Sequence, residues 1–428
     1  MLKGIANAFR IPELRNKILV SIAILALYRF GAYLPAPGVP FARMLEAFSA
    51  ASASSGAIAV LNLFSGGALS RVSVFSLGIM PYITAQIILQ MMQAVIPSLG
   101  ELAKEGESGQ RKITQYTRYL TIVLALINAI GYLFLFKSYG INFSQMGFPE
   151  AIEDIIIVGV LVTGAIIIMW LGEVITQRGV GNGMSLIIFT SIISRLPGSI
   201  ASSINTEGDF GMGLAVTILI IAVVALTIPA IVFVERAQRR IPVNYAKRVQ
   251  GRRMMGGQST YLPIKVNTAG VVPIIFASAL IYFPAQIAAL LNVSWLTSFA
   301  NSLSTGPVNW VLTMILIVFF AYFYTSMVFN PDEMSENLRK QGGFIPGIRP
   351  GKATTDYIHD VLRRVTLPGG IFIGLIAVVP AILFYFTDNQ LIQALGGTSI
   401  LIMIGVALDT MNKVESQLKM HNYEGFFK

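Results

Sequence analysis

The feature that most constrains this chain is a series of long apolar blocks that carry almost no charge. Of the 428 residues, 54% are hydrophobic and 12% are charged, whereas an ordinary soluble domain has about 25% charged residues. Such blocks are typical of transmembrane helices, because ~20 apolar residues span the ~30 Å hydrocarbon layer of a bilayer. The composition therefore excludes a soluble enzyme and predicts an all-α polytopic membrane protein.

Ten blocks are long enough to be candidate spans. Their expected bounds are 18–34, 72–96, 118–136, 152–172, 184–203, 212–234, 270–291, 308–329, 367–386 and 391–411. The block at 184–203 is the weakest, because Arg195 and Pro197 interrupt its end. Basic residues precede the first block as in a signal peptide, but Arg29 and the Tyr33-Leu34-Pro35 sequence fit a cleavage site poorly. We therefore expect that block to be a retained span.

Lys and Arg are distributed unevenly among the connections between these blocks. Twenty-six of the 31 lie in the N-terminal segment, the C-terminal tail and every second loop between them. The positive-inside rule then places both termini in the cytoplasm. The net charge of +10 is largely this topology signal, and by itself it does not indicate nucleic-acid binding.

The number of spans suggests two halves, 1–205 and 206–428. With five spans each, the halves would enter the membrane from opposite sides. Structurally similar halves would then be inverted, as in many transporters and channels. No convincing residue-level repeat accompanies this parity, so the inverted arrangement is a hypothesis.

The residue inventory excludes several kinds of chemistry. The chain has no cysteine, and its two histidines, His359 and His421, lie in polar segments. Disulfides, thiolate catalysis, cysteine-ligated metals and a histidine-based site within the bilayer are therefore excluded. We predict no catalytic residue, no metal site and no cofactor.

Residues 61–71, LNLFSGGALSR, form an apolar segment too short to cross the bilayer. Gly66 and Gly67 weaken a helix by roughly 1 kcal/mol each, and Arg71 would be costly facing lipid. One interpretation is a short re-entrant helix inside a watery cavity, because irregular backbone is tolerated there. The other is an external amphipathic helix on the membrane surface.

Two pairs of apolar residues share a spacing of four. Ile79 and Ile83 lie in the second block, and Met184 and Ile188 begin the fifth. This spacing places each pair on one helix face. Ordinary packing or lipid contact explains it equally well, so spacing alone assigns these residues no role.

The two large cytoplasmic loops differ in charge. Seven of the 18 residues from Arg236 to Arg253 are basic and none is acidic, which suits anionic lipid headgroups or a polyanion such as ribosomal RNA. Asn244 and Tyr245 within the loop at 235–268 favour a structured hairpin. The loop at 330–366 has six basic and five acidic residues, which favours protein recognition. Its GIRPGK sequence lacks the spacing of a phosphate-binding loop.

Several segments, in order along the chain, resemble the SecY family, the channel subunit of the bacterial Sec protein translocase. They are FSGGALSRVSVFSLGIMPYI at 64–83, KEGESGQRKITQYTR at 104–118, RGVGNG at 178–183, VERAQRRIPVNYAKRVQGRR at 234–253, FNPDEMSENLRKQGGFIPGIRPG at 329–351 and GGTS at 396–399. The resemblance covers essentially the whole chain. It implies ten transmembrane helices in two inverted five-helix halves around a central pore, with a re-entrant plug helix.

The resemblance also implies roles for individual residues. The pore ring would be Ile79, Ile83, Met184, Ile188, Ile275 and Ile402. The plug at 61–71 would include Asn62, Phe64, Ser65, Gly66, Gly67, Leu69 and Arg71. The lateral gate would include Gln90, Asn128 and Ser278. Partner docking would involve Arg239, Arg240, Lys247, Arg248, Arg252, Arg253 and Arg349. The family usually has a branched aliphatic residue where Met184 stands.

The function implied is a protein-conducting channel in the bacterial plasma membrane. It would pass unfolded secretory polypeptides and release transmembrane segments sideways into lipid. The implied partners are the SecE and SecG membrane subunits, the SecA motor ATPase, the translating ribosome and anionic lipids. Energy would come from a partner, because the chain has no recognisable nucleotide site.

Two other classes of protein are alternatives: an ion-coupled transporter and an intramembrane hydrolase. An ion-coupled transporter usually places carboxylates near the midplane, but the acidic residues here lie at the ends of the blocks or beyond them. An intramembrane hydrolase is opposed by the cysteine and histidine inventory. Solute uptake driven by an ion gradient would indicate a transporter, whereas polypeptide crosslinked within the pore would indicate translocation.

Overall fold

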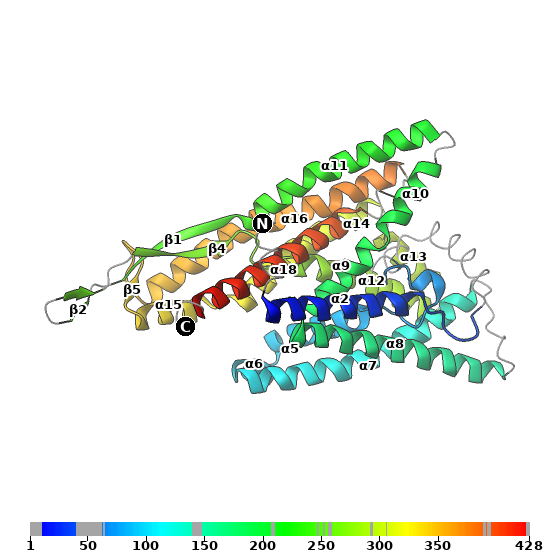
Figure 1. Cartoon of the computed structure of the whole chain (residues 1–428), viewed down its shortest axis with the longest axis horizontal. Coiled ribbons are helices and arrows are strands. Elements are labelled where there is room, and N and C mark those ends of the chain that lie inside the picture. The colour runs from blue at the N-terminus through cyan, green and yellow to red at the C-terminus, as the bar shows by residue number, and fades with distance from the viewer. Residues whose placement is uncertain are drawn as a thin grey trace.

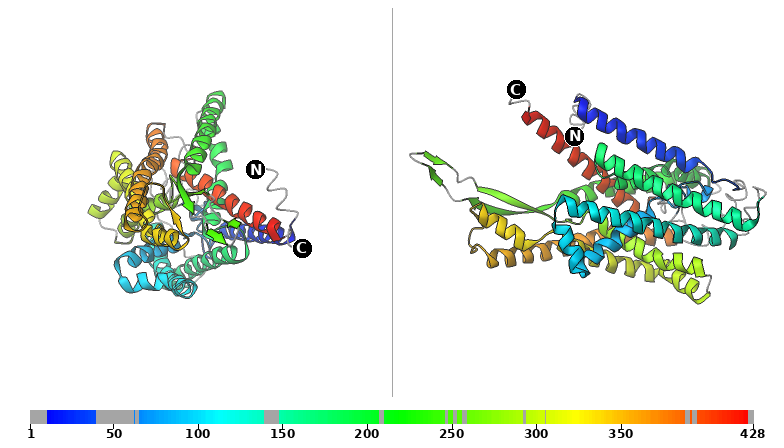
Figure 2. Two further views of the ribbon diagram at one scale, coloured as in Figure 1. Left: turned by 90° about the vertical axis from the view of Figure 1, so that its left-hand side faces the viewer. Right: turned by 90° about the horizontal axis from the view of Figure 1, so that it is seen from below.

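The structure is a computed structural model. It describes residues 11–39, 62, 65–138, 148–206, 210–245, 248–250, 253–255, 259–291, 294–304, 306–387, 391 and 395–424. The described chain forms an elongated bundle of helices, and a β-hairpin projects from one end of it (Figures 1 and 2). Helix α2 begins and helix α18 ends toward that same end of the bundle.

Helices dominate the first half of the chain. They are α2 (Pro12–Tyr33), η1 (Leu69–Arg71, a 3₁₀ turn), α5 (Met80–Val95), α6 (Pro97–Lys104), α7 (Glu107–Ser138), α8 (Glu150–Arg178), α9 (Gly183–Ile193) and α10 (Leu196–Thr206). Proline stands in the first turn of α2, α5 and α6, where its missing N–H costs no intrahelical hydrogen bond.

The second half contains both helices and strands. Its helices are α11 (Phe210–Arg236), α12 (Val272–Leu291), α13 (Ser294–Ser304), α14 (Pro307–Val328), α15 (Pro331–Lys340), α16 (Lys352–Thr387) and α18 (Gly397–Glu424). Its strands are β1 (Gln238–Tyr245), β2 (Arg248–Gln250), β3 (Arg253–Met255), β4 (Ser259–Lys265) and β5 (Gly343–Phe344).

Length and composition mark many of these helices as able to cross a membrane. Within the described residues, seven helical stretches qualify, of which Gly183–Ile204 combines α9 with α10 and Pro307–Lys340 combines α14 with α15. The pair α5 and α6, bent by 103°, makes an eighth if it is one span. Helices α12 and α18 also overlap predicted blocks, but α12 contributes only a shorter apolar stretch and α18 is not among the qualifying helices. The chain is thus a multi-pass membrane protein, and the count of ten spans remains a prediction.

The second predicted block begins later than expected. Residues 72–79 form turns, and α5 begins only at Met80. Val72 has φ 40° and Gly78 has φ 57°, values incompatible with a right-handed helix. The expected span at 72–96 was therefore wrong over its first eight residues.

Two other blocks agree with helical stretches, each with a difference in detail. The block at 184–203 agrees with the candidate span Gly183–Ile204, which contains α9 and α10 and a turn at Ser194 and Arg195, the place where Arg195 and Pro197 weakened the pattern. The block expected at 367–386 is part of α16, which begins earlier, at Lys352. Residues 352–366 of the supposed cytoplasmic loop at 330–366 therefore belong to a helix that continues directly into the membrane segment.

The described apolar side chains form three buried clusters. The largest joins helices from α2 to α18 at the centre of the bundle. A second joins α7 and α8 to the segment around Leu69, Val72 and Leu77. A third lies outside the bundle, beneath the β-sheet.

Candidate functional site

The first pair of predicted ring residues lies at the start of α5. Ile79 is the N-cap of this helix, and Ile83 lies one turn further along. The backbone N–H of Ile83 donates to the Ile79 carbonyl at 3.1 Å. Both side chains are buried. The four-residue spacing therefore corresponds to one helical turn, as predicted.

The second pair lies at the start of α9. Asn182 caps this helix by accepting hydrogen bonds from the backbone N–H groups of Met184, at 3.1 Å, and Ser185, at 3.5 Å. The sulfur of Met184 lies so close to Gly172 of α8 that a Cβ at position 172 would stand 2.3 Å from it. Glycine at 172 thus leaves room for Met184.

The two remaining ring residues lie far away in the sequence but not in the fold. Ile275 lies on α12 and is 8% exposed, and Ile402 lies on α18 and is 1% exposed. Both belong to the large central cluster that also contains the other four. We call these six residues the waist set: Ile79, Ile83, Met184, Ile188, Ile275 and Ile402. The structure places the whole set in one apolar interior and not on the outer surface.

The described part of the predicted plug is a compact turn held by its own polar groups. The Asn62 carbonyl accepts from the Gly67 N–H at 2.9 Å, and its side-chain oxygen accepts from the Ser70 N–H at 3.2 Å. The Ser65 hydroxyl donates to the Asn62 carbonyl at 3.0 Å and accepts from the Leu69 N–H at 3.1 Å. Asn62, Ser65 and Leu69 are buried. Phe64 lies outside the described residues.

Glycine is required at two positions of this turn. Gly66 and Gly67 have φ of 66° and 82°, in the left-handed region that side chains with a Cβ rarely adopt. These glycines, which the sequence identified as helix-weakening, therefore allow the backbone to form a turn here. The regular structure here is the 3₁₀ turn η1, at Leu69–Arg71.

Two arginines attach this turn to helix α2. Arg29 donates to the Gly66 carbonyl at 2.8 Å and to the Tyr33 hydroxyl at 3.0 Å. The guanidinium groups of Arg29 and Arg71 lie 4.6 and 4.1 Å from the centre of the Tyr33 ring. Arg71, which would be costly facing lipid, thus stacks on an aromatic ring.

The predicted gate residues lie on three helices that pack together. Gln90 is on α5, Asn128 on α7 and Ser278 on α12, and α7 packs against both α5 and α12. The Ser278 hydroxyl donates to the Ile275 carbonyl of its own helix at 2.9 Å. The side-chain oxygen of Gln90 is buried and has no hydrogen-bond partner in the described part of the chain.

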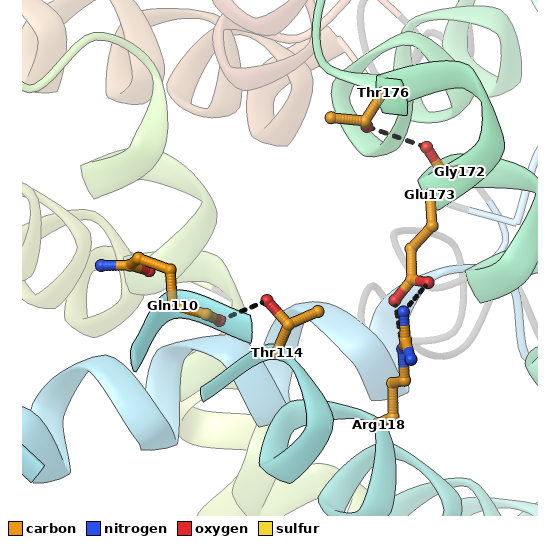
Figure 3. A network of polar contacts seen from close by, with 6 residues as sticks. All are labelled: Gln110, Thr114, Arg118, Gly172, Glu173 and Thr176. Carbon is orange, nitrogen blue, oxygen red and sulfur yellow. Dashed lines mark hydrogen bonds and ion pairs between the residues drawn. The ribbon is translucent and has the colours of Figure 1, made fainter. Parts of the chain in front are cut away.

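An ion pair that the sequence did not predict joins α7 to α8. Arg118 donates to both carboxylate oxygens of Glu173, from Nε at 2.8 Å and from Nη2 at 2.6 Å (Figure 3). The Glu173 side chain is 13% exposed. This bidentate geometry is the strongest form of an arginine–carboxylate contact, so it fastens the two helices to each other.

The predicted hairpin is confirmed, and it forms part of a larger sheet. Strand β1 pairs antiparallel with β4, from Gln238 opposite Lys265 to Asn244 opposite Ser259. Strand β5, from the loop at 330–366, pairs with the other edge of β1. The two loops, which the sequence distinguished by their charge, therefore build one sheet together.

One apolar core supports this sheet. It contains Ile241, Val243 and Ile264 from the hairpin, and Ile345, Ile358 and Leu362 from the second loop and the start of α16. Because α16 continues into the membrane segment, the sheet is attached to the helical bundle by packing as well as by the chain itself. We call β1, β4, β5, α15 and the first turns of α16 the docking unit.

Three of the predicted docking residues, Arg239, Arg240 and Arg349, lie at exposed positions on or beside this unit. Arg239 and Arg240 are exposed on β1, and the Arg240 guanidinium lies 4.8 Å from the centre of the Tyr261 ring. Arg349 is exposed in the turn after β5. Arg248 and Arg253 lie in the small β2–β3 hairpin at the tip. Lys247 and Arg252 lie outside the described residues.

The bundle has the fold of known channels. A solved structure described as that of a protein-conducting channel matches it with a TM-score of 0.64 and 18% identity, over 96% of each chain. Sec61 in a canine ribosome–channel complex matches with a TM-score of 0.61 and 17% identity, again over 96% of each. The chain is thus a multi-pass helical membrane protein with the fold of these channel structures, and its waist set is buried inside that fold.

The sequence comparisons specify the family. The SecY family model matches residues 73–411. The protein translocase subunit SecY of Mycobacterium tuberculosis is 48% identical over 446 residues, which cover all of both chains. The chain therefore belongs to the SecY family, a family of channel proteins and not of enzymes. This decides against the transporter and hydrolase alternatives.

Proposed function

We propose that this chain is the pore-forming subunit through which unfolded polypeptides cross the bacterial plasma membrane. The observation that carries the proposal is the waist set, whose six apolar side chains come from α5, α9, α12 and α18 and share one buried cluster. A channel for unfolded polypeptide must accept every kind of side chain, so its narrowest point cannot rely on specific binding groups. Apolar side chains exclude water and ions when no polypeptide is present.

Flexibility of the waist set is part of the proposal. Met184 is unbranched and has three rotatable bonds, so it adapts its shape to neighbours of different size. The waist set can then close around polypeptides of different girth. The family usually has a branched aliphatic residue at position 184. Methionine keeps this position apolar and makes its side chain more flexible.

The turn at 61–71 is proposed as the plug that closes the resting pore. The burial of Asn62, Ser65 and Leu69 supports a position inside the protein over the alternative of a helix on the membrane surface. Its hydrogen bonds are largely internal, which lets the turn move as a unit. Its described contacts with α2, through Arg29 and Arg71, are polar and can be exchanged for water.

Sideways release into lipid is proposed to occur where α7 packs against α12. Apolar client segments would leave the pore there, because their transfer out of water into lipid is favourable. Gln90, Asn128 and Ser278 lie on the three helices that meet at this place. Gln90 Oε1 is buried and has no hydrogen-bond partner among the described residues, and such an atom weakens the closed packing.

The proposed topology has ten spans in two inverted halves, 1–205 and 206–428, with both termini in the cytoplasm. The positions of the start of α2 and the end of α18, toward the docking unit, support cytoplasmic termini (Figure 1). The docking unit at that end carries exposed basic residues, among them Arg239, Arg240 and Arg349, in agreement with the positive-inside rule.

The docking unit is proposed to bind the translating ribosome and the SecA motor. The Sec61 structure to which this fold is similar is described within a ribosome–channel complex. Exposed arginines match the phosphate groups of RNA. The residues proposed to take part in docking are Arg239, Arg240, Lys247, Arg248, Arg252 and Arg253 in the loop at 235–268, and Arg349 in the loop at 330–366. SecE, SecG and anionic lipids would complete the assembly in the membrane.

Site-specific crosslinking tests the polypeptide path. A photoreactive amino acid is placed at Ile83, Ile188 or Ile275, and a secretory polypeptide is stalled during translocation. We expect crosslinks to the stalled chain from all three positions and none from Leu219, which is 65% exposed on the outer surface of α11. Crosslinking from Leu219 alone, or from none of these sites, would contradict the proposed pore.

A further inference from the structure

A short connection, residues 266–271, joins the docking unit to helix α12. It follows β4 directly, and it leads into the helix that carries Ile275 and Ser278. We call it the junction. Its position means that any movement of the hairpin relative to the membrane reaches α12 through these residues.

The pairing of β1 with β4 continues beyond the sheet into the junction. The last strand pair is Gln238 with Lys265. The N–H of Val266 then donates to the Ala237 carbonyl at 2.9 Å. Next, the side-chain amide of Asn267 donates to Glu235 Oε2, in the last turn of α11, at 2.6 Å. The contacts thus connect the end of α11 with the start of α12.

Asn267 makes more than one contact from a buried position. It is 8% exposed, and its amide also donates to the Gly270 carbonyl at 3.1 Å. Among the described residues, no cation lies within ion-pair distance of Glu235. A largely buried carboxylate needs hydrogen bonds to replace its water, so Asn267 is an important partner of Glu235.

The other sides of the junction pack tightly against three further helices. The Thr268 and Thr325 hydroxyls lie 2.9 Å apart, which joins the junction to α14. A Cβ at Gly369 of α16 would lie 2.5 Å from the Val266 carbonyl oxygen, and one at Gly405 of α18 would lie 2.4 Å from Val271. Backbone this closely enclosed transmits displacement instead of absorbing it.

We propose that the hydrogen bond between Asn267 and Glu235 is the positioning contact that converts partner docking into movement of α12. It makes the end of α11 and the start of α12 move together when the hairpin is displaced. Without this hydrogen bond, the hairpin can tilt while α12 stays packed against α7. The inference rests on the proposed docking function. It assigns to Asn267 and Glu235 a role in control of the gate, in addition to their role in packing.

Spin-label distances across the gate test this role. The chain has no native cysteine, so Leu280→Cys on α12 and Ile127→Cys on α7 are the only attachment sites, and both positions are exposed on the outer surface. The label-to-label distance is measured in reconstituted channels with and without bound ribosomes. In the wild-type background, we expect ribosome binding to lengthen this distance.

Three variants test whether this hydrogen bond transmits movement to α12 or only supports folding of the channel. Asn267→Asp places two carboxylates together, and we expect it to abolish the distance change while ribosome affinity stays unchanged. The double variant Asn267→Asp with Glu235→Gln again pairs an amide donor with a carboxylate, and we expect it to restore the change. Asn309→Asp alters an amide on α14 that donates to the Leu303 carbonyl, away from the junction, and should leave the change intact.

The outcomes also distinguish the inference from the docking proposal. A normal distance change in Asn267→Asp, or no rescue in the double variant although it folds and binds ribosomes, would overturn the inference alone. Ribosome binding to the wild-type channel without any distance change would do the same. Failure of ribosomes to bind the wild-type channel would overturn the docking proposal and the inference together.

Discussion

The ring of Phe75 stacks on the ring of Tyr28, with centroids 5.9 Å apart and planes 8° from parallel. Tyr28 lies on α2, and its hydroxyl is 2.7 Å from that of Ser191 on α9. Phe75 belongs to the turns that connect the proposed plug with α5. The stack therefore attaches this connection to two helices of the bundle, within the buried cluster that also contains the waist set.

Glycine at position 31 makes this stack possible. A Cβ there would lie 2.2 Å from the Phe75 ring, so we expect Gly31→Ala to displace Phe75 and to cost about 1–3 kcal/mol, the range for overpacking. Thermal unfolding of the purified channel measures the loss. Gly159→Ala on α8 is the control, because a Cβ at position 159 meets nothing within 4 Å. Equal unfolding temperatures for the two variants would contradict the prediction.

The ion pair between Arg118 and Glu173 should contribute measurably to stability. We expect Arg118→Lys to lose one of the two hydrogen bonds, because an ammonium group cannot reproduce the guanidinium fork. The expected cost is about 1 kcal/mol, below the ~1.5–3 kcal/mol of a buried charged hydrogen bond, because the Arg118 side chain is 43% exposed.

A surface ion pair on the same helix provides the matched control. Arg111 pairs with Glu107 in α7, and both side chains are at least 78% exposed. Arg111→Lys should therefore leave unfolding unchanged, since exposed pairs contribute little. If Arg111→Lys destabilised the channel as much as Arg118→Lys, the bidentate pair would have no special role.

Removal of the plug should open the resting channel to ions. We expect proteoliposomes that contain the chain without residues 61–71 to release trapped halide faster than those with the intact chain, because the waist set would be the remaining barrier. Arg71→Lys keeps a cation available to the Tyr33 ring and should leave the resting release rate unchanged. Identical release from deleted and intact channels would show that these residues do not form a plug.

Charge reversal in the turn after β5 should affect export and not assembly. We expect Arg349→Glu to slow SecA-driven export into inverted membrane vesicles, because it introduces repulsion at the proposed docking surface, while the channel still inserts. Lys104→Glu makes the same change in net charge at an exposed position on α6, outside the docking unit, and serves as the control. Export at the wild-type rate by Arg349→Glu would remove Arg349 from the docking surface.

Local sequence patterns predicted the helices and strands whose formation depends mainly on neighbouring residues. Absence of charge over ~20 residues identifies a membrane segment wherever it occurs, and the hairpin expected from Asn244 and Tyr245 among the basic residues is present. The pairing of Ile79 with Ile83 follows from the helical repeat. Ile275 and Ile402 had no such signal, and only the family resemblance connected them with the other four.

The errors arose where backbone conformation depends on distant partners. Residues 72–79 are apolar enough for a span, but the Phe75 ring fits against Gly31, and the Val72 backbone carbonyl accepts from the Ala36 N–H at 2.9 Å. These contacts hold the segment in turns. Likewise, nothing in the loop at 330–366 indicates that Gly343 and Phe344 extend the sheet of a loop about 100 residues earlier.

The amino-acid sequence by itself identified a membrane protein and its family, and it predicted which loops face the cytoplasm, because charge, hydropathy and motifs can be read residue by residue. Only the tertiary structure decided which side chains meet: the six of the waist set, Tyr28 with Phe75, Arg118 with Glu173, and Asn267 with Glu235. Such contacts depend on how helices far apart in the chain pack against one another, and the free energy of that packing belongs to the whole bundle and not to any one segment.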